Sequence, residues 1–161
     1  MRVSDLDQEV KDSAILCVGM LLSKEAYNQA EQTIAIQVLI DRMTNEMTRL
    51  SAVKALQTAM NNPAIASVIP VMIIPEVSTI SSFLRKNQRQ LRVTSLNLSV
   101  TLIRNGLKKC EDILIELPQL INDQDLHVSQ LGEKDLKVDC FIIILFQLCI
   151  WRYCLWKGAS L

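Results

Sequence analysis

The sequence predicts an all-α protein, an α-solenoid of about three and a half HEAT-type two-helix repeats followed by an atypical C-terminal hydrophobic tail. Three observations lead to this fold class. The first is composition: half of the 161 residues are hydrophobic, whereas Gly and Pro number four each and aromatic residues make up only 4%. Such a chain, rich in Leu, Ile, Val and Ala and poor in turn formers, favours helices. The second is an internal period near forty residues, and the third is a helix that is apolar on two sides.

The period shows in a loose three-residue pattern. A cap-like polar residue is followed by a basic or hydroxyl residue four positions later and a small residue three positions after that. The four copies are Asp7–Lys11–Ala14, Asn45–Arg49–Ala52, Gln88–Arg92–Ser95 and Asp125–Ser129–Gly132, at intervals of 38, 43 and 37 residues. A self-similar period of this length is typical of HEAT repeats. The polar residue can accept bonds from the free N–H groups of a starting helix, and the small residue lets the adjacent helix approach closely.

The helix that is apolar on two sides is predicted over residues 84–105 as one long helix. Its polar start includes Arg89 and Arg92. One apolar stripe consists of Leu84, Leu91, Leu98 and Leu102, and a second set consists of Leu96, Val100 and Ile103. A helix that is apolar on two sides needs neighbours on both, which is the condition of a helix inside a stack.

Four further helices are predicted around it, starting with the second helix of an incomplete repeat over residues 4–22. Its apolar positions at helical spacing are Val10, Ala14, Cys17, Val18 and Leu21. A helix over about 29–43 has Ile34, Val38 and Leu39 inward, and the next, from Asn45, has Leu50, Val53, Leu56 and Met60. Asn61-Asn62-Pro63 ends that helix, because a residue before proline avoids the helical region. The fourth, over 107–121, opens repeat four, and Pro118 should kink or shorten it.

Two stretches leave more than one interpretation. Residues 64–80 contain Pro70 and Pro75 around a β-branched run that could be a strand, and we prefer a broken first helix of the third repeat. Beyond it, Asn122, Asp123 and Asp125 are expected to form a turn and cap before a helix entered by Leu126, Val128 and Leu131. We therefore divide the chain into a repeat segment, 1–131, and a divergent tail, 132–161. The tail holds five of the seven aromatic residues, and it fits a helix packed on the stack, a membrane anchor, or a segment foreign to the repeats.

The composition points away from catalysis and from nucleic acid. The formal net charge is zero, although 77–110 holds seven basic residues and no acid, and 111–139 holds eight acids and two lysines. Neighbouring patches of opposite sign can steer a protein partner, but we prefer the simpler interpretation that they are solvated faces of neighbouring helices. The single histidine, His127, has no partners at metal-ligand spacing, and no cofactor or catalytic motif is present. Five cysteines without CxxC spacing and no signal segment indicate a cytoplasmic or nuclear protein with free thiols.

Four stretches resemble one family. They are VSDLDQEVK near the start, MTNEMTRLSAVKAL at 43–56, SSFLRKNQRQLR at 81–92 and ELPQLINDQDLHVSQL at 116–131. In residue identity, order and spacing they are similar to the cullin-associated, neddylation-dissociated (CAND) proteins, and the resemblance covers about residues 3–131. The chain resembles a segment from the middle of a much longer family member. After Leu131 the likeness ends, which a truncated, alternatively spliced or mispredicted product explains.

The resemblance implies a non-catalytic scaffold that binds unmodified cullin with its RING subunit and promotes substrate-receptor exchange on SCF-type ubiquitin ligases. It also implies a link to the TATA-binding protein. Basic residues near the starts of second helices, which line the concave face of HEAT stacks, are the candidate partner contacts: Lys11, Arg49, Arg89 and Arg92. Two alternatives remain, a fragment without independent activity and a membrane-tethered interaction module.

Overall fold

A computed structural model describes residues 3–121 and 128–130 of the chain. The chain divides into two compact units, residues 1–116 and 117–161. The elements are α1 (Val3–Ser23), α2 (Gln29–Thr44), α3 (Arg49–Ala59), α4 (Pro63–Met72), the 3-10 helix η1 (Ile74–Glu76), α5 (Val77–Leu84), α6 (Arg89–Arg104) and α7 (Glu111–Ile121). Every regular element in the described residues is helical, which confirms the all-α prediction.

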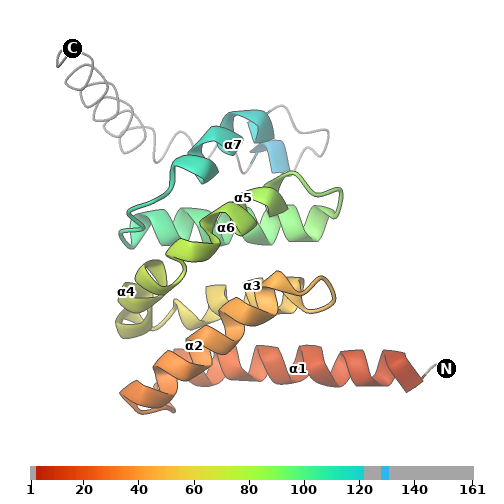
Figure 1. Cartoon of the computed structure of the whole chain (residues 1–161), viewed down its shortest axis with the longest axis vertical. Coiled ribbons are helices and arrows are strands. Elements are labelled where there is room, and N and C mark those ends of the chain that lie inside the picture. Colours follow the sequence, from red (N-terminus) through yellow and green to blue (C-terminus); the bar gives the residue numbers. More distant parts are fainter. Residues whose placement is uncertain (1–2, 122–127, 131–161) are drawn as a thin grey trace. The chain divides into compact units, whose positions relative to one another are not determined.

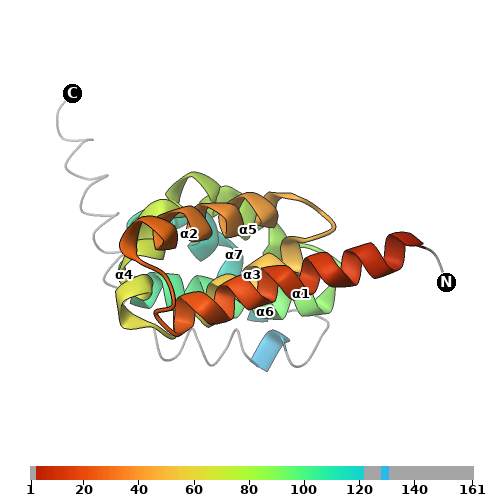
Figure 2. The ribbon, with the colours of Figure 1, turned by 90° about the horizontal axis from the view of Figure 1, so that it is seen from below.

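The helices of the first unit stack in two layers. Helices α1, α3 and α6 follow one another in one layer, while α2 and the α4–η1–α5 segment form the other (Figures 1 and 2). Helix α2 pairs with α3, and α5 pairs with α6, so the described residues contain two complete two-helix repeats. Helix α1 takes the place of a second helix and α7 begins a further repeat. This arrangement confirms the HEAT-type solenoid.

Small residues let α1 and α3 approach closely. Ala52, Ala55 and Ala59 of α3 are completely buried. A Cβ atom placed on Gly19 of α1 would lie 2.6 Å from the backbone oxygen of Ala55, so only glycine fits there. The small residues Ala52 and Ser95, predicted from the repeat pattern to lie at helix contacts, are both fully buried.

Most of the apolar residues singled out in the first two helices are not buried. In α1 the exposed residues include Val10, Ala14, Cys17 and Leu21, and the buried ones are Ile15, Gly19 and Leu22. In α2, Leu39 is buried as predicted, but Ile34 is 65% exposed and Val38 is 42% exposed. The physical reason is that α1 packs mainly against α3, so within the described residues only its α3-facing side is covered.

The single long helix predicted over 84–105 is also wrong at its start. Helix α5 ends at Leu84 and α6 begins at Arg89, so 85–88 is a connection. Arg92 closes this connection, since its Nη1 donates to the carbonyl oxygens of Lys86 (2.9 Å) and Asn87 (3.1 Å). Burial on two sides is confirmed for most apolar residues of α6, namely Leu91, Leu96, Leu98, Val100 and Leu102, whereas Ile103 is half-buried.

Three other helix starts differ from the predictions. Helix α3 begins at Arg49 rather than at Asn45, because residues 45–48 form a turn. Asp7 lies inside α1 and pairs with Lys11 rather than capping a helix start. Helix α7 begins at Glu111 instead of Leu107, because the chain turns after α6 through Gly106, whose φ is +89°. The N–H of Leu107 donates to the oxygen of Leu102 (3.0 Å), which ends α6 in a glycine-closed turn.

The broken helix predicted over residues 64–80 is confirmed. Helix α4 and the η1–α5 segment meet at a bend of 58°. Asn62 begins α4 with Pro63 in the first helical position, which confirms the predicted stop after α3. Within the described residues no single helix has the length and hydropathy of a membrane span. Helix α4 and the η1–α5 segment have that length and hydropathy only when they are taken together, as a bent pair.

Some predictions fall outside the described residues. They include the role of His127, the Asn122–Asp125 turn, Leu131 and the tail 132–161. Residues 128–130 are helical, in agreement with the predicted entry of the next helix at Val128. The division of the chain at residue 131 stays a prediction.

Candidate protein-binding edge

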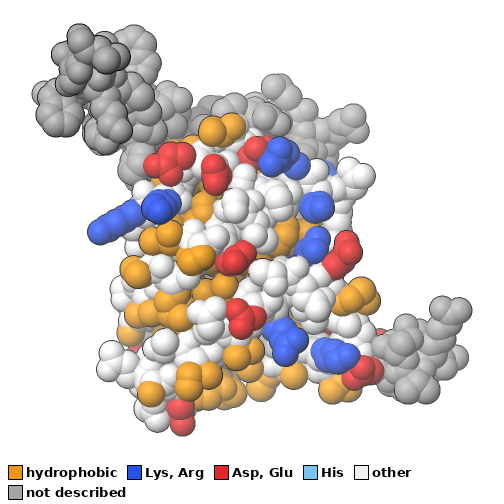
Figure 3. Space-filling view, in the orientation of Figure 1, with side chains coloured by type: hydrophobic (Ala, Val, Ile, Leu, Met, Phe, Trp, Pro, Cys, Tyr) orange, Lys and Arg blue, Asp and Glu red, His pale blue; other side chains and the backbone are white. Residues whose placement is uncertain are grey.

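Basic side chains gather at the edge of the stack where α3 and α6 begin. We define the basic edge as Lys11 on α1, Arg42 on α2, Arg49 on α3, and Arg89 and Arg92 on α6. Figure 3 shows Lys and Arg side chains mainly over the right half of the molecule, the half in which α3 and α6 begin in Figure 1. Four of these five residues were predicted from the sequence.

At one end of the basic edge, two cations share a small cavity. It has a volume of about 240 Å³ and is lined by Lys11, Ala14, Ile15, Arg42 and Thr48. The Thr48 hydroxyl donates to the carbonyl oxygen of Arg42 (2.8 Å), which fixes the turn between α2 and α3. The cavity thus combines two positive charges at the surface with apolar walls from α1.

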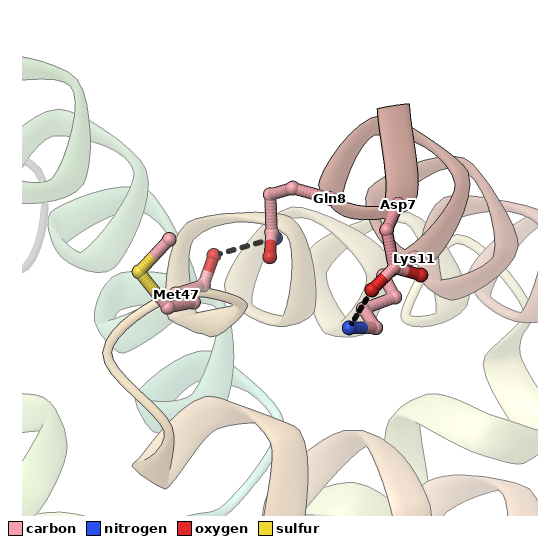
Figure 4. Close-up of polar contacts among 4 residues, drawn as sticks. All are labelled: Asp7, Gln8, Lys11 and Met47. Atoms are coloured by element: carbon pink, nitrogen blue, oxygen red, sulfur yellow. Dashed lines mark hydrogen bonds and ion pairs between the residues drawn. The ribbon is translucent and has the colours of Figure 1, made fainter. Parts of the chain in front are cut away.

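Neighbouring polar contacts hold α1 against this turn, as Figure 4 shows. Gln8 Nε2 donates to the carbonyl oxygen of Met47 at 3.0 Å. Lys11 Nζ lies 2.6 Å from Asp7 Oδ2, and both side chains remain more than half exposed. An exposed pair one helical turn apart contributes only about 0.3–0.5 kcal/mol. An anionic group from a partner can therefore compete for Lys11 at small cost.

Arg49 joins one repeat to the next. Its guanidinium carbon lies 5.4 Å from the centre of the Phe83 ring on α5, within the range of a cation–π interaction. The side chain is only 16% exposed, and Glu46 lies 3.9 Å from it. Arg49 therefore stabilises the stack and presents only part of its charge at the surface.

The two arginines of α6 differ in their surroundings. Arg89 is the first residue of the helix and is exposed. Arg92 is half-buried and bonds to the carbonyl oxygens of the α5–α6 connection. Partner contact by Lys11, Arg49, Arg89 and Arg92 stays a prediction. Because Lys11 lines a cavity together with Arg42, it is the first to test.

Sequence reasoning missed Arg42. It searched only the starts of second helices, and Arg42 is in the last turn of a first helix. Lys11 and Arg42 are 31 residues apart and meet only because α1 packs beside the α2–α3 turn. One signal in the sequence could have indicated Arg42. A basic residue in the last turn of a helix interacts favourably with the helix dipole, so its charge is expected at the C-terminal end of that helix.

A second polar cluster links α7 to α5. The Glu116 carboxylate is 8% exposed, and its Oε2 lies 3.4 Å from Nε of Arg85, which is 63% exposed. The Ser81 hydroxyl donates to the backbone oxygen of Asp112 (2.9 Å). With Ser78 and Ile115 these residues line a cavity of about 240 Å³. The contacts anchor the first half of α7, where Glu111 and Asp112 in the first turn favour the helix dipole.

Cysteine and carboxylate positions offer no metal-binding group in the part of the chain that the structure describes. Cys17 is exposed and Cys110 is buried, and both are free thiols. Burial raises the pKa of the Cys110 thiol, and the negative charge of Glu111 raises it further. Such a thiol is less nucleophilic at neutral pH than an ordinary one.

A stack of helix pairs that presents a charged edge defines a helical-repeat binding scaffold. No protein-family model matches the chain. The chain is 36% identical over 138 residues to cullin-associated NEDD8-dissociated protein 1 of Drosophila melanogaster, an alignment that covers 81% of the chain. It is 40% identical over 138 residues to cullin-associated NEDD8-dissociated protein 2 of Mus musculus, covering 82%, and 38% identical over 134 residues to protein 1 of Arabidopsis thaliana, covering 80%.

The chain belongs to the cullin-associated NEDD8-dissociated family and matches a segment of it. It spans 11% of the length of each of these three curated relatives. Their names describe association with cullin and dissociation from NEDD8, and none describes a catalytic activity.

Proposed function

We propose that this chain is a non-catalytic scaffold that binds a cullin through its basic edge. The observation that carries the proposal is the similarity, over about four-fifths of the chain, to proteins named for their association with cullin. The cavity lined by Lys11 and Arg42 supports it, because its two cations and apolar walls suit an acidic side chain beside an apolar one.

In finer detail, the partner is unmodified cullin with its RING subunit, and the outcome is exchange of substrate receptors on SCF-type ligases. The TATA-binding protein is a second proposed partner. The chain spans about a tenth of the length of its relatives, and binding is the step of this activity that we propose for it. Binding to the cullin is therefore the property to measure.

The test is size-exclusion chromatography and fluorescence anisotropy of the full chain with a purified cullin–RING complex, with and without conjugated NEDD8. We expect binding to the unmodified complex, weakened at least tenfold by the double charge reversal Lys11→Glu/Arg42→Glu. Because charges at such an edge act mainly on association, the loss should shrink as salt rises.

The matched control is Lys108→Glu/Lys109→Glu. Both residues are exposed lysines beyond the other end of α6, whose sixteen residues place them about 24 Å from its start. This variant makes the same change in net charge and should bind normally. A folded chain that never binds, or an equal loss in both variants, would contradict the proposed role of the basic edge.

A further inference from the structure

The cavity between α5 and α7 is separate from the basic edge and has the opposite chemistry. We call it the α5–α7 cavity. It has a volume of about 240 Å³ and is lined by Ser78, Ser81, Arg85, Asp112, Ile115 and Glu116. All six residues belong to the first unit, and they come from the first helices of two consecutive repeats. The described chain therefore supplies both walls of the cavity.

Glu116 brings a buried carboxylate with unused hydrogen-bonding capacity into this cavity. Its side chain is 8% exposed, and its buried Oε2 has no hydrogen-bond donor among the described residues. Nε of Arg85 lies 3.4 Å from Oε2 without forming a hydrogen bond, and the Arg85 side chain is 63% exposed. A carboxylate can accept about four hydrogen bonds, and buried polar atoms in folded proteins nearly always have a partner. Oε2 can therefore accept a donor that reaches it through the cavity.

The charges of the cavity favour a cation as the incoming group. Two carboxylates, those of Glu116 and Asp112, line it together with one guanidinium, that of Arg85. The Ser81 hydroxyl already donates its proton to the backbone oxygen of Asp112 (2.9 Å), so toward the cavity it can only accept. Figure 3 shows acidic side chains at the top of the view, where α7 lies in Figure 1. A positively charged hydrogen-bond donor matches these acceptors.

The size of the cavity and its apolar wall suit a single side chain. Its volume lies below the range of about 300–1,000 Å³ that is typical of small-molecule pockets. Ile115 is 65% exposed and offers an apolar surface to the methylene groups of a long side chain. Ser78 and Asp112 are exposed as well, so the cavity is open to solvent. A lysine or arginine side chain combines the required charge with such methylene groups.

We propose that the α5–α7 cavity binds a lysine or arginine side chain of a protein partner. The charged head of that side chain donates to Glu116 Oε2, and its methylene groups pack on Ile115. Arg85 shares the Glu116 carboxylate with the incoming cation and, being largely exposed, can turn toward solvent. The buried carboxylate gives the contact its strength, because a charge-assisted hydrogen bond is stronger where water is excluded.

The first test is an NMR titration of the full chain with short capped peptides that differ only in their central residue. That residue is arginine, lysine or citrulline, which has the shape of arginine without its charge. We expect the arginine and lysine peptides to shift the amide signals of Ser78, Asp112 and Ile115 in a saturable way, and the citrulline peptide to bind at least tenfold more weakly. The absence of saturable shifts at these residues, or equal binding of the citrulline peptide, would overturn the proposal.

The second test asks whether Glu116 itself holds the cation. Glu116→Gln keeps the size of the side chain, removes its charge and should weaken binding of the arginine peptide at least fivefold. The matched control is Glu111→Gln, an exposed position of the same helix outside the cavity lining. It makes the same change in net charge and should bind normally. Equal losses in the two variants, with circular dichroism showing both folded, would mean unspecific charge attraction and overturn the site.

The third test separates a binding site from a purely structural ion pair. Arg85→Gln removes the cation that competes for Glu116, so it should tighten binding of the arginine peptide several-fold. Unchanged or weaker binding in the folded variant would contradict the shared carboxylate. None of these variants alters Lys11 or Arg42. Failure of the cavity to bind peptide therefore leaves the proposed cullin binding at the basic edge intact, and failure of cullin binding leaves the cavity intact.

Discussion

Glu25 is held in a backbone conformation that suits glycine. Its φ is +57°, and it closes α1 through donation from Ala26 N–H to the oxygen of Leu21 (3.1 Å). Gly106 plays the same part after α6. We expect Glu25→Gly to raise the free energy of unfolding by about 0.5–1 kcal/mol, because it removes left-handed strain but adds freedom to the unfolded chain. Urea unfolding measures the change. Gly106→Ala should lower stability, and a destabilised Glu25→Gly variant would contradict the argument.

Cys110 should make stability fall at alkaline pH. Its raised pKa means that the unfolded chain loses the thiol proton first as pH rises. The contribution is therefore complete below the ordinary thiol pKa and declines above it, by at most about 1.4 kcal/mol per pH unit. We expect Cys110→Ala to show a shallower decline between about pH 8 and pH 10 in urea unfolding. Cys17→Ala, at an exposed position, serves as the control. A decline unchanged in Cys110→Ala would contradict the prediction.

Asn62 connects two elements from a buried position. Its Oδ1 accepts from Ala64 N–H (3.0 Å) at the start of α4, and its Nδ2 donates to the oxygen of Leu22 (3.2 Å) near the end of α1. We expect Asn62→Ala to cost about 2–3 kcal/mol in calorimetry or urea unfolding, because the helix cap and a buried interhelix bond are both lost. The comparison is Asn28→Ala, which removes an exposed cap of α2 and should cost about 1 kcal/mol. Equal losses would mean that the bond to Leu22 contributes nothing.

The helices themselves were largely predictable, and the covered faces were not. Helical spacing correctly placed Val10, Cys17 and Leu21 on one side of α1, yet that side is exposed. Periodicity shows which residues share a face, but burial depends on a neighbour that the local sequence does not describe. The 85–88 connection was missed for a related reason, since the bonds of Arg92 to its carbonyl oxygens form only once the chain has turned.

Across the molecule as a whole, the basic edge was predictable only in part. The repeat pattern located Lys11 and Arg49 because each follows a recurring polar residue at the same spacing. Arg42 was missed because it joins Lys11 through packing between helices rather than through sequence spacing. The resemblance, by contrast, needed no geometry, since four short stretches in the right order were specific enough to indicate the family.

Stacked repeats stabilise one another mainly through neighbouring interfaces, so damage at one interface should decay with distance. Gly19 offers a test, because a Cβ there would lie 2.6 Å from the oxygen and 2.7 Å from the Cα of Ala55. Backbone atoms cannot move aside as a flexible side chain can. We therefore expect Gly19→Ala to destabilise the chain even though alanine favours helices by about 1 kcal/mol over glycine.

Hydrogen exchange followed by mass spectrometry should show which helices lose amide protection in this variant. Amides of α1 and α3 should exchange faster in Gly19→Ala, while those of α6 should keep nearly wild-type protection, because α6 packs on α3 and lies one layer further from the damaged interface. Ser13→Ala, at an exposed position of the same helix, controls for helix propensity and should leave all three helices at least as protected as before. Uniform loss across α1, α3 and α6 would instead mean that the repeats unfold as one cooperative unit.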